Sequence, residues 1–147
     1  MGLIVTTPGI LLRALASGHV RKNEALTTSG PYAYTRNPLY LGSLVIAIGF
    51  LIAARSWWIV AVAVVYFLAV YIPVIRGEEN YLRSKFPEFE NYTRTVPRLL
   101  PRLSLDSSEK GSFSWELYKK HREYNAILGA LAVSVILLAK MFWLKNY

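Results

Sequence analysis

The sequence predicts an all-α integral membrane protein with three to four transmembrane helices and a helical cytoplasmic segment. Hydrophobic residues make up 54% of the 147 residues and gather into long runs without charge. The Lys and Arg residues behind the net charge of +8 lie mostly between these runs. About twenty apolar residues in a helix cross a hydrocarbon core about 30 Å thick. A soluble helical bundle is the alternative, and three such runs in so short a chain disfavour it.

The first element is a short apolar stretch near the start of the chain. "MGLIVTTPGILLRALASGHV" is interrupted by Pro8 and carries Arg13 inside its apolar part. A signal peptide would place its positive charge before the apolar stretch and a small-residue cleavage site after it. We therefore expect residues 9–17 to form a short or partial membrane helix.

Two longer runs follow, at 39–54 and 57–75, and only two residues separate them. Such a short link predicts an antiparallel helical hairpin. The first run has sixteen residues without a charge, so it spans a bilayer only if aromatic residues lie at both interfaces. The residues in these places are Tyr34, Tyr40, Trp57 and Trp58.

Residues 76–101 are expected to be an ordered, helical segment outside the membrane. "GEENYLRSKFPEFENYTRTVPRLLP" begins with apolar residues at helical spacing, and Pro87 should end that helix. A second turn is expected over 89–94. The following "VPRLLP" should be extended, because residues before proline avoid the α region.

The rest of the chain is predicted to be an addition to this core. Ser114 is a plausible helix N-cap, and the helix should run almost unbroken to Lys145, with Gly129 as its only weak point. The expected organisation is a membrane core over 1–103, a flexible linker over 104–113, and a further helix with a membrane span over 114–147.

The distribution of basic residues predicts the orientation in the membrane. The stretch 76–125 holds ten Lys and Arg residues and 18–38 holds three, whereas the hairpin turn has only Arg55. Because cytoplasmic loops are enriched in Lys and Arg, both long segments should face the cytoplasm across the cell's inner (plasma) membrane. The excess of basic residues is then explained by the membrane topology and by attraction to anionic lipid, which is worth ~1 kcal/mol per basic residue. We expect no nucleic-acid partner, since no basic-aromatic pattern of such a module is present.

The sequence lacks the residues that disulfides, metal sites and a Ser-His-Asp triad would need. The chain has no cysteine, so disulfides and thiolate metal sites are excluded. His19 and His121 lie far apart with no ligand three or four residues away, and we expect no metal site. A Ser-His-Asp triad has little support because the one aspartate, Asp106, is in the linker.

Two groups of residues remain as candidates for chemistry. One is the rim "GPYAYTRNPLYLG" at 30–42, and the other is the acid pair Glu78–Glu79. Both lie at the same end of the predicted hairpin, where carboxylates and tyrosines could hold a cation. Alternatively, the acids pair with arginines such as Arg36, Arg76 or Arg83, and the tyrosines are interfacial anchors.

These two groups also carry a resemblance. "TSGPYAYTRNPLYLG", then an apolar hairpin, then "RGEENYLRSKFPEFENYTRTVPR", resembles the isoprenylcysteine carboxyl methyltransferase family and the related phospholipid N-methyltransferases. The shared pattern is GPY, RHPxYxG, a membrane hairpin, EE and an aromatic-rich Y–VP segment. The match covers about 11–101, and the remaining residues lie outside it.

The resemblance implies S-adenosylmethionine as the cofactor, bound at the cytoplasmic membrane face. The residues that fall where the family contacts the cofactor are Tyr32, Asn37, Pro38, Tyr40, Glu78 and Glu79, with Leu26 and Thr27 of "EALT" as further lining. No residue is assigned to bond making, and Glu78, Glu79 and Tyr40 are expected to position the reactants. The chain has Asn37 where the family usually has His, and an amide can hold a cofactor but cannot act as a general base.

The implied activity is methyl transfer to a lipidic or hydrophobic small-molecule acceptor, either O-methylation of a carboxylate or N-methylation of an amine. The segment 76–101 would then be the catalytic segment. One alternative is an NADPH-dependent membrane reductase of the steroid-reductase type, with Arg94, Arg98 and Arg102 as phosphate ligands. The other is a membrane protein without catalytic activity.

Overall fold

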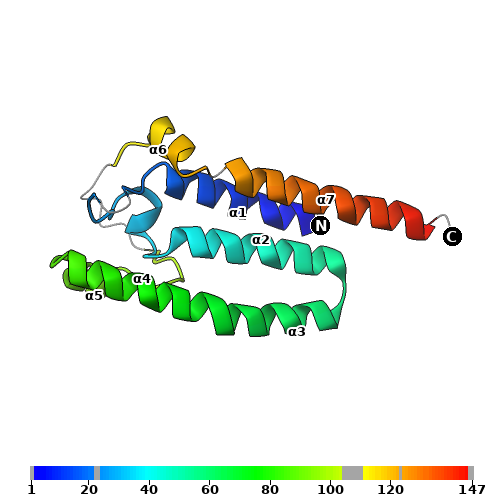
Figure 1. Cartoon of the computed structure of the whole chain (residues 1–147), viewed down its shortest axis with the longest axis horizontal. Helices are drawn as coiled ribbons and strands as arrows, with labels where there is room; N and C mark the ends of the chain where they lie inside the picture. The colour runs from blue at the N-terminus through cyan, green and yellow to red at the C-terminus, as the bar shows by residue number, and fades with distance from the viewer. Residues whose placement is uncertain (1, 22–23, 104–110, 123, 146–147) are drawn as a thin grey trace.

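The computed structural model describes residues 2–21, 24–103, 111–122 and 124–145, and every regular element in these ranges is a helix (Figure 1). The predicted all-helical class is therefore confirmed. In chain order the elements are α1 (Gly2–Ser17), the 3-10 turn η1 (Gly30–Ala33), α2 (Pro38–Ala54), α3 (Trp57–Tyr66), the π-helical turn η2 (Phe67–Tyr71), α4 (Ile72–Lys85), α5 (Phe89–Thr95), α6 (Trp115–Lys120) and α7 (Tyr124–Lys145).

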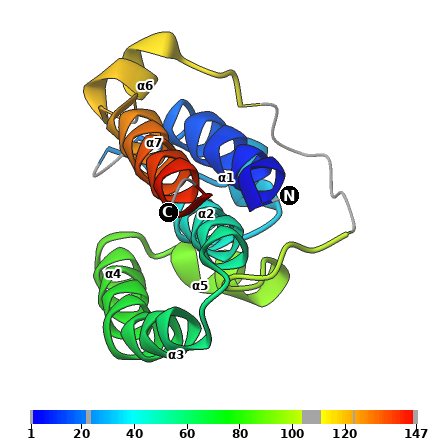
Figure 2. The ribbon, with the colours of Figure 1, turned by 90° about the vertical axis from the view of Figure 1, so that its right-hand side faces the viewer.

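The long helices lie roughly side by side, and the short elements gather at one end of them. Figure 1 shows η1, α5 and α6 together at the end opposite the α2–α3 turn. The end-on view in Figure 2 shows α2 between α1 and the α3–α4 helix, with α7 beside α1. Both long basic segments are thus at the same end of the bundle, as the predicted topology requires.

The helix made of α3, η2 and α4 is continuous over Trp57–Lys85 and is 29 residues long. It is long and apolar enough to cross a membrane, and only 6% of its most apolar window is buried inside the protein. Trp57 and Trp58 are 87% and 84% exposed. Apolar surface of this extent marks an interaction with a membrane or a partner. The apolar stretches of the other helices in the described part are shorter, at 10–17 residues, and are Ile4–Ser17, Pro38–Ala54 and Tyr124–Ile136. The number of spans therefore stays a prediction.

One predicted boundary at the start of the chain is wrong. Helix α1 begins at Gly2 and includes Pro8, whereas we expected a helix only over 9–17. Pro8 removes one backbone hydrogen bond within this helix. Helix α4 runs on from the predicted span 57–75 and ends at Lys85, just before Pro87, as expected for the helix at the start of 76–101. The residue at which the membrane span itself ends stays a prediction.

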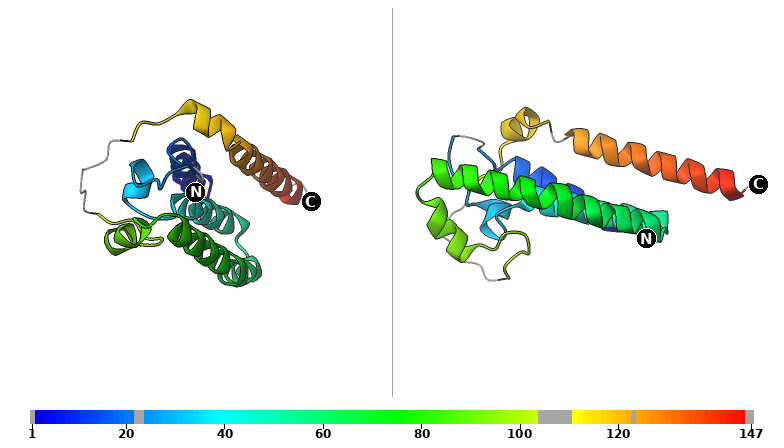
Figure 3. Two further views of the ribbon diagram at one scale, coloured as in Figure 1. Left: turned by 60° about the vertical axis from the view of Figure 1, so that its left-hand side comes forward. Right: turned by 60° about the horizontal axis from the view of Figure 1, so that its bottom comes forward.

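The C-terminal part also differs from its prediction. Ser114 does cap α6, since its hydroxyl accepts a hydrogen bond from the Leu117 N–H at 3.3 Å. The expected unbroken helix is wrong, because α6 ends at Lys120 and Arg122 has a positive φ of 52°. This turn lets α6 pack against the end of α1 and separates it from α7, which also contacts α1. The right-hand view of Figure 3 shows α7 extending away from the other helices. Most of the predicted linker, 104–110, lies outside the described residues.

Glycines allow α1 and α2 to pack closely. A Cβ on Gly9 would lie 2.7 Å from the Gly42 carbonyl oxygen, and one on Gly49 would lie 2.5 Å from Cγ2 of Thr6. Small residues at such positions let helix backbones approach each other in a membrane. Arg13 of α1 then reaches the start of α2, where its guanidinium donates to the Leu39 carbonyl at 3.3 Å and to the Ser43 hydroxyl.

Gly9→Leu is expected to destabilise the protein by about 1–3 kcal/mol, the usual cost of overpacking a close interface. The leucine side chain would meet backbone atoms of α2, which cannot move aside without separating the two helices. The thermal unfolding midpoint in detergent measures the effect. Gly129→Leu in α7 is the control, because a Cβ there meets no described atom within 4 Å. Equal midpoints for the two variants would contradict this account of the packing.

A small apolar core holds the short elements together at the end of the bundle. It consists of Phe89, Tyr92 and Val96, with Leu26, Leu82 and Phe86 packed around it. Burial raises the pKa of the Tyr92 phenol well above its ordinary value, so the group stays protonated and donates to the Tyr32 carbonyl at 2.6 Å. This contact ties η1 to α5.

Candidate active site

A cavity of about 270 Å³ lies at this end of the bundle, between η1, the start of α2 and α4. Seven of the eight predicted cofactor residues line it: Leu26, Thr27, Tyr32, Asn37, Pro38, Tyr40 and Glu78. The structure therefore brings together residues from three separate stretches of the sequence. That these residues bind a cofactor remains a prediction.

Turn residues fix the position of the rim. Gly30 has a φ of +59°, in the left-handed region that favours glycine, and the His19 ring packs against it. Pro38 is the first residue of α2, where its fixed φ suits a helix start and its missing N–H costs nothing. The Asn37 carbonyl accepts the first helical bond from Leu41 at 3.0 Å.

Glu79 is the centre of a buried polar network behind the cavity. Its side chain is 3% exposed, and Oε2 lies 2.7 Å from Nη2 of Arg98. Oε1 lies 3.6 Å from Nη1 of Arg36 and accepts a hydrogen bond from Nδ2 of Asn37 at 3.2 Å. Of the arginine pairs that the alternative interpretation expected, Glu79 forms the one with Arg36, whereas its closer partner Arg98 was not expected. Glu79 is not among the residues that line the cavity, so its predicted contact with the cofactor has no support in this geometry.

Asn37 belongs to both the network and the cavity. Its amide nitrogen donates to Glu79 and, at 2.9 Å, to the Arg98 carbonyl oxygen. These two acceptors fix which amide atom is the nitrogen. What Asn37 can offer a ligand is therefore its carbonyl oxygen, an acceptor.

Glu78 has a different environment from its neighbour. Successive residues of a helix point about 100° apart, so Glu78 faces the cavity while Glu79 enters the network. The Tyr40 side chain interacts electrostatically with the Glu78 carboxylate. Glu78 is solvent-exposed and lines the cavity wall.

Sequence reasoning missed several lining residues, including Arg21, Arg36, Tyr81 and His121. Arg36 is notable because its Nε is buried and has no hydrogen-bond partner among the described residues. Tyr81 could have been found, since it lies one helical turn beyond Glu78. His121 could not, because nothing local relates it to the motifs.

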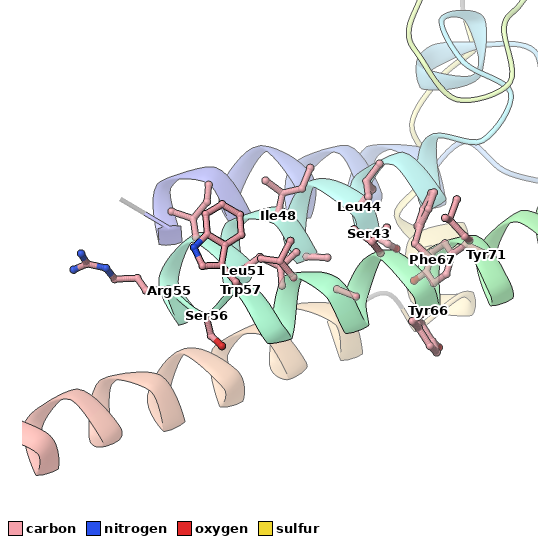
Figure 4. A pocket seen from close by; sticks show the side chains of 16 residues that line it. Ser43, Leu44, Ile48, Leu51, Arg55, Ser56, Trp57, Tyr66, Phe67 and Tyr71 are labelled. Atoms are coloured by element: carbon pink, nitrogen blue, oxygen red, sulfur yellow. The ribbon is translucent and has the colours of Figure 1, made fainter.

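A second space adjoins the cavity. It is a mainly apolar groove of about 910 Å³ between α2 and the α3–η2 helix. Figure 4 shows Tyr71 and Phe67 at one end and Arg55 and Trp57 at the other. The rings of Tyr40, from the cavity, and Tyr71, from the groove, meet edge to face with centroids 5.6 Å apart. This tyrosine pair lies where the two spaces meet.

Comparison with known proteins places the chain in a family. The model of the phospholipid methyltransferase family matches residues 11–88. The chain belongs to this family. The matched region contains all eight predicted site residues, and the resemblance carried by the GPY, RNPLY and EE motifs is confirmed. This membership and the long apolar helix together indicate membrane association.

Two curated relatives are named for metal resistance. The chain is 40% identical over 119 residues to the cobalt-zinc-cadmium resistance protein CzcN of Cupriavidus metallidurans, covering 80% of this chain and 53% of the relative. It is 40% identical over 110 residues to the nickel-cobalt-cadmium resistance protein NccN of Alcaligenes xylosoxydans xylosoxydans, covering 74% and 51%. The chain thus spans about half the length of these relatives. No solved structure matches.

The metal-ligating side chains of the described residues do not form a cluster. No three of their His, Asp or Glu side chains lie close enough together to hold a metal ion. The relatives are named for metal resistance, but the described part of this chain contains no set of three such side chains that could bind a metal ion.

Proposed function

We propose that this chain is a membrane methyltransferase that uses S-adenosylmethionine and a lipidic or hydrophobic acceptor. One observation carries the proposal: the motif residues of a methyltransferase family, separate in the sequence, line a single cavity. The cavity adjoins an apolar groove on the side of the helices where lipid would lie.

The residues present fit this cofactor. When bound, S-adenosylmethionine supplies a methyl group activated by an adjacent sulfonium. Glu78 and the faces of Tyr32 and Tyr40 favour cationic groups, so they suit its sulfonium or ammonium end. The unpartnered Nε of Arg36 is a donor for a carboxylate. A volume of about 270 Å³ is close to the lower end of the usual range for ligand pockets, about 300 Å³.

The acceptor would lie in the groove with its reactive group at the pair Tyr40–Tyr71. Its apolar part would follow α2 and α3 toward Arg55. Methyl transfer is an in-line displacement, so the main task of the chain is to hold the two reactants close and aligned. Tyr40, which contacts Tyr71 and interacts with Glu78, lies at the junction where such alignment is needed.

We also propose that the cavity faces the cytoplasm. The basic residues of 18–38 and 76–103 gather at the end of the bundle that contains the cavity, while the opposite turn has only Arg55. This distribution agrees with the enrichment of Lys and Arg in cytoplasmic loops.

Two of the three arginines proposed as phosphate ligands of a reductase have other partners. Arg98 is paired with Glu79, and Arg102 donates from Nε to the Ala33 carbonyl at 2.8 Å and from Nη1 to the Thr95 carbonyl at 3.3 Å. These guanidinium groups hold the loop after α5 and are not gathered toward a shared ligand.

Ligand-induced thermal stabilisation in detergent tests the proposed function. S-adenosylhomocysteine at a hundred times its Kd should add about 2.7 kcal/mol of stability, and NADPH should add none. Stabilisation by NADPH alone would favour the reductase. No response to either compound would overturn the methyltransferase proposal and favour a membrane role without catalysis.

A further inference from the structure

His121 lines the same cavity but comes from a different part of the chain. It lies in the turn between α6 and α7, beyond the residues 11–88 that match the family model. Its Nδ1 is 2.7 Å from the Leu117 carbonyl oxygen. A carbonyl oxygen only accepts hydrogen bonds, so Nδ1 carries the proton in the neutral ring. Nε2 is then the nitrogen that can accept a proton.

The segment that carries His121 is held against the cavity by specific contacts. The Ser114 N–H donates to the Gly18 carbonyl at 2.8 Å. At the other end of α6, Nζ of Lys120 lies 3.2 Å from Oε1 of Glu24, close in sequence to the cavity residues Leu26 and Thr27. The position of His121 therefore depends on packing with the matched region.

The other polar groups of the site are poor proton acceptors. Asn37 does not titrate, and Glu79 is ion-paired with Arg36 and Arg98. Glu78 interacts with Tyr40 at the cavity wall, and its proposed role is to attract the cationic end of the cofactor. The remaining charged or titratable groups that line the cavity with His121 are Arg21, Arg36, Tyr32, Tyr40, Tyr81 and Tyr92, and Lys119, Lys120 and Arg122 adjoin it in sequence. Histidine is the side chain of this set that ordinarily exchanges a proton near neutral pH.

We propose that His121 is the proton acceptor for methylation of an amine, an inference that rests on the proposed function. Nε2 of His121 takes one proton from the acceptor's ammonium group and becomes an imidazolium. The freed electron pair of the nitrogen forms the new N–CH₃ bond, while the sulfonium C–S bond breaks and sulfur keeps that electron pair. The imidazolium then returns its proton to water. A carboxylate acceptor would need no such base and would be repelled by Glu78.

The experiment compares two variants of the same segment in the full chain. His121→Gln keeps a hydrogen-bonding group at the cavity but cannot take up a proton at neutral pH. Glu116→Gln is the control, because Glu116 is an exposed residue of α6 that is not among the cavity-lining residues. The probes are S-adenosylhomocysteine for binding and S-adenosylmethionine with phosphatidylethanolamine in detergent for turnover.

His121→Gln should lower kcat at pH 7 by about a hundredfold, the lower end of the usual effect of a general base. Its Kd for S-adenosylhomocysteine should stay within about twofold of the parent. The loss should shrink as rising pH deprotonates more of the free amine, whereas Glu116→Gln should keep the parental profile.

Three outcomes would overturn the inference. They are an unchanged rate and pH profile for His121→Gln, loss of S-adenosylhomocysteine binding by that variant, and no methylation of phosphatidylethanolamine by the parent. Each of these leaves the proposed function standing if the parent binds S-adenosylhomocysteine. If the parent does not bind it, both proposals fail.

Discussion

Glu79→Gln is expected to destabilise the protein by about 3–5 kcal/mol, the usual cost of removing one partner of a buried ion pair. The Glu79 side chain is 3% exposed and joins α4 to the start of α2 and to the segment after α5. Its removal leaves the guanidinium of Arg36 in a site where 12% of that side chain is exposed. Arg98 is 48% exposed and can regain water, so the lower part of the range is expected. Thermal or denaturant unfolding in detergent measures the loss.

Glu90→Gln provides the matched control. Glu90 also pairs with an arginine, with 2.9 Å between its Oε2 and Nε of Arg83, but the two side chains are 55% and 48% exposed. Exposed pairs contribute about 0–1 kcal/mol, so this variant should unfold close to the parent. Similar losses of stability for Glu79→Gln and Glu90→Gln would show that the burial of Glu79 does not increase the contribution of its ion pairs to stability.

The location of the site was predictable because the hairpin sets it. A two-residue link between two apolar runs brings the start of one run and the end of the other to the same end of the bundle. The rim at 30–42 and the acids at 78–79 therefore had to lie near each other. The tight turns of the rim could also be predicted from Gly30 and Pro38, because the backbone preferences of these two residue types do not depend on the rest of the fold.

The separate roles of the two acids were not predictable. They depend on the rotation of α4 about its axis, and one residue of helix changes direction by about 100°. They also depend on Arg98, which lies 61 residues from Asn37 in sequence and reaches it through the extended segment after α5. The residues around Glu78 in the sequence determine neither the rotation of α4 nor the position of Arg98.

The break between α6 and α7 shows the same limit. Residues 121–122 contain no proline or glycine, so local propensity favours a continuous helix. Tertiary packing overrides it, because α6 lies against the end of α1, where Phe113 and the His19 ring meet with centroids 6.0 Å apart. His121 reaches the cavity because of this break. Its position there could not be predicted from the sequence, because the break depends on tertiary packing.

Glu78→Gln is expected to weaken binding of S-adenosylhomocysteine by about ten- to a hundredfold. A charge-assisted contact contributes about 1.5–3 kcal/mol, and each 1.4 kcal/mol is a factor of ten in affinity. Glu78 is solvent-exposed, which favours the lower end. The substitution keeps the size of the side chain and removes no buried contact, since Glu78 is exposed, so the unliganded protein should unfold near the parental temperature. Calorimetric titration and unfolding of the same preparation measure both quantities.

Glu88→Gln is the control for this last variant. Glu88 is also solvent-exposed and lies in the same acidic segment. It is not among the residues that line the cavity. Its substitution should leave the affinity within about twofold of the parent, because a solvated charge outside the site is strongly screened. If Glu78→Gln binds normally but unfolds earlier, Glu78 is a structural residue like its neighbour. If Glu88→Gln loses as much affinity as Glu78→Gln, the effect comes from net charge, and the assignment of Glu78 to the cofactor is wrong.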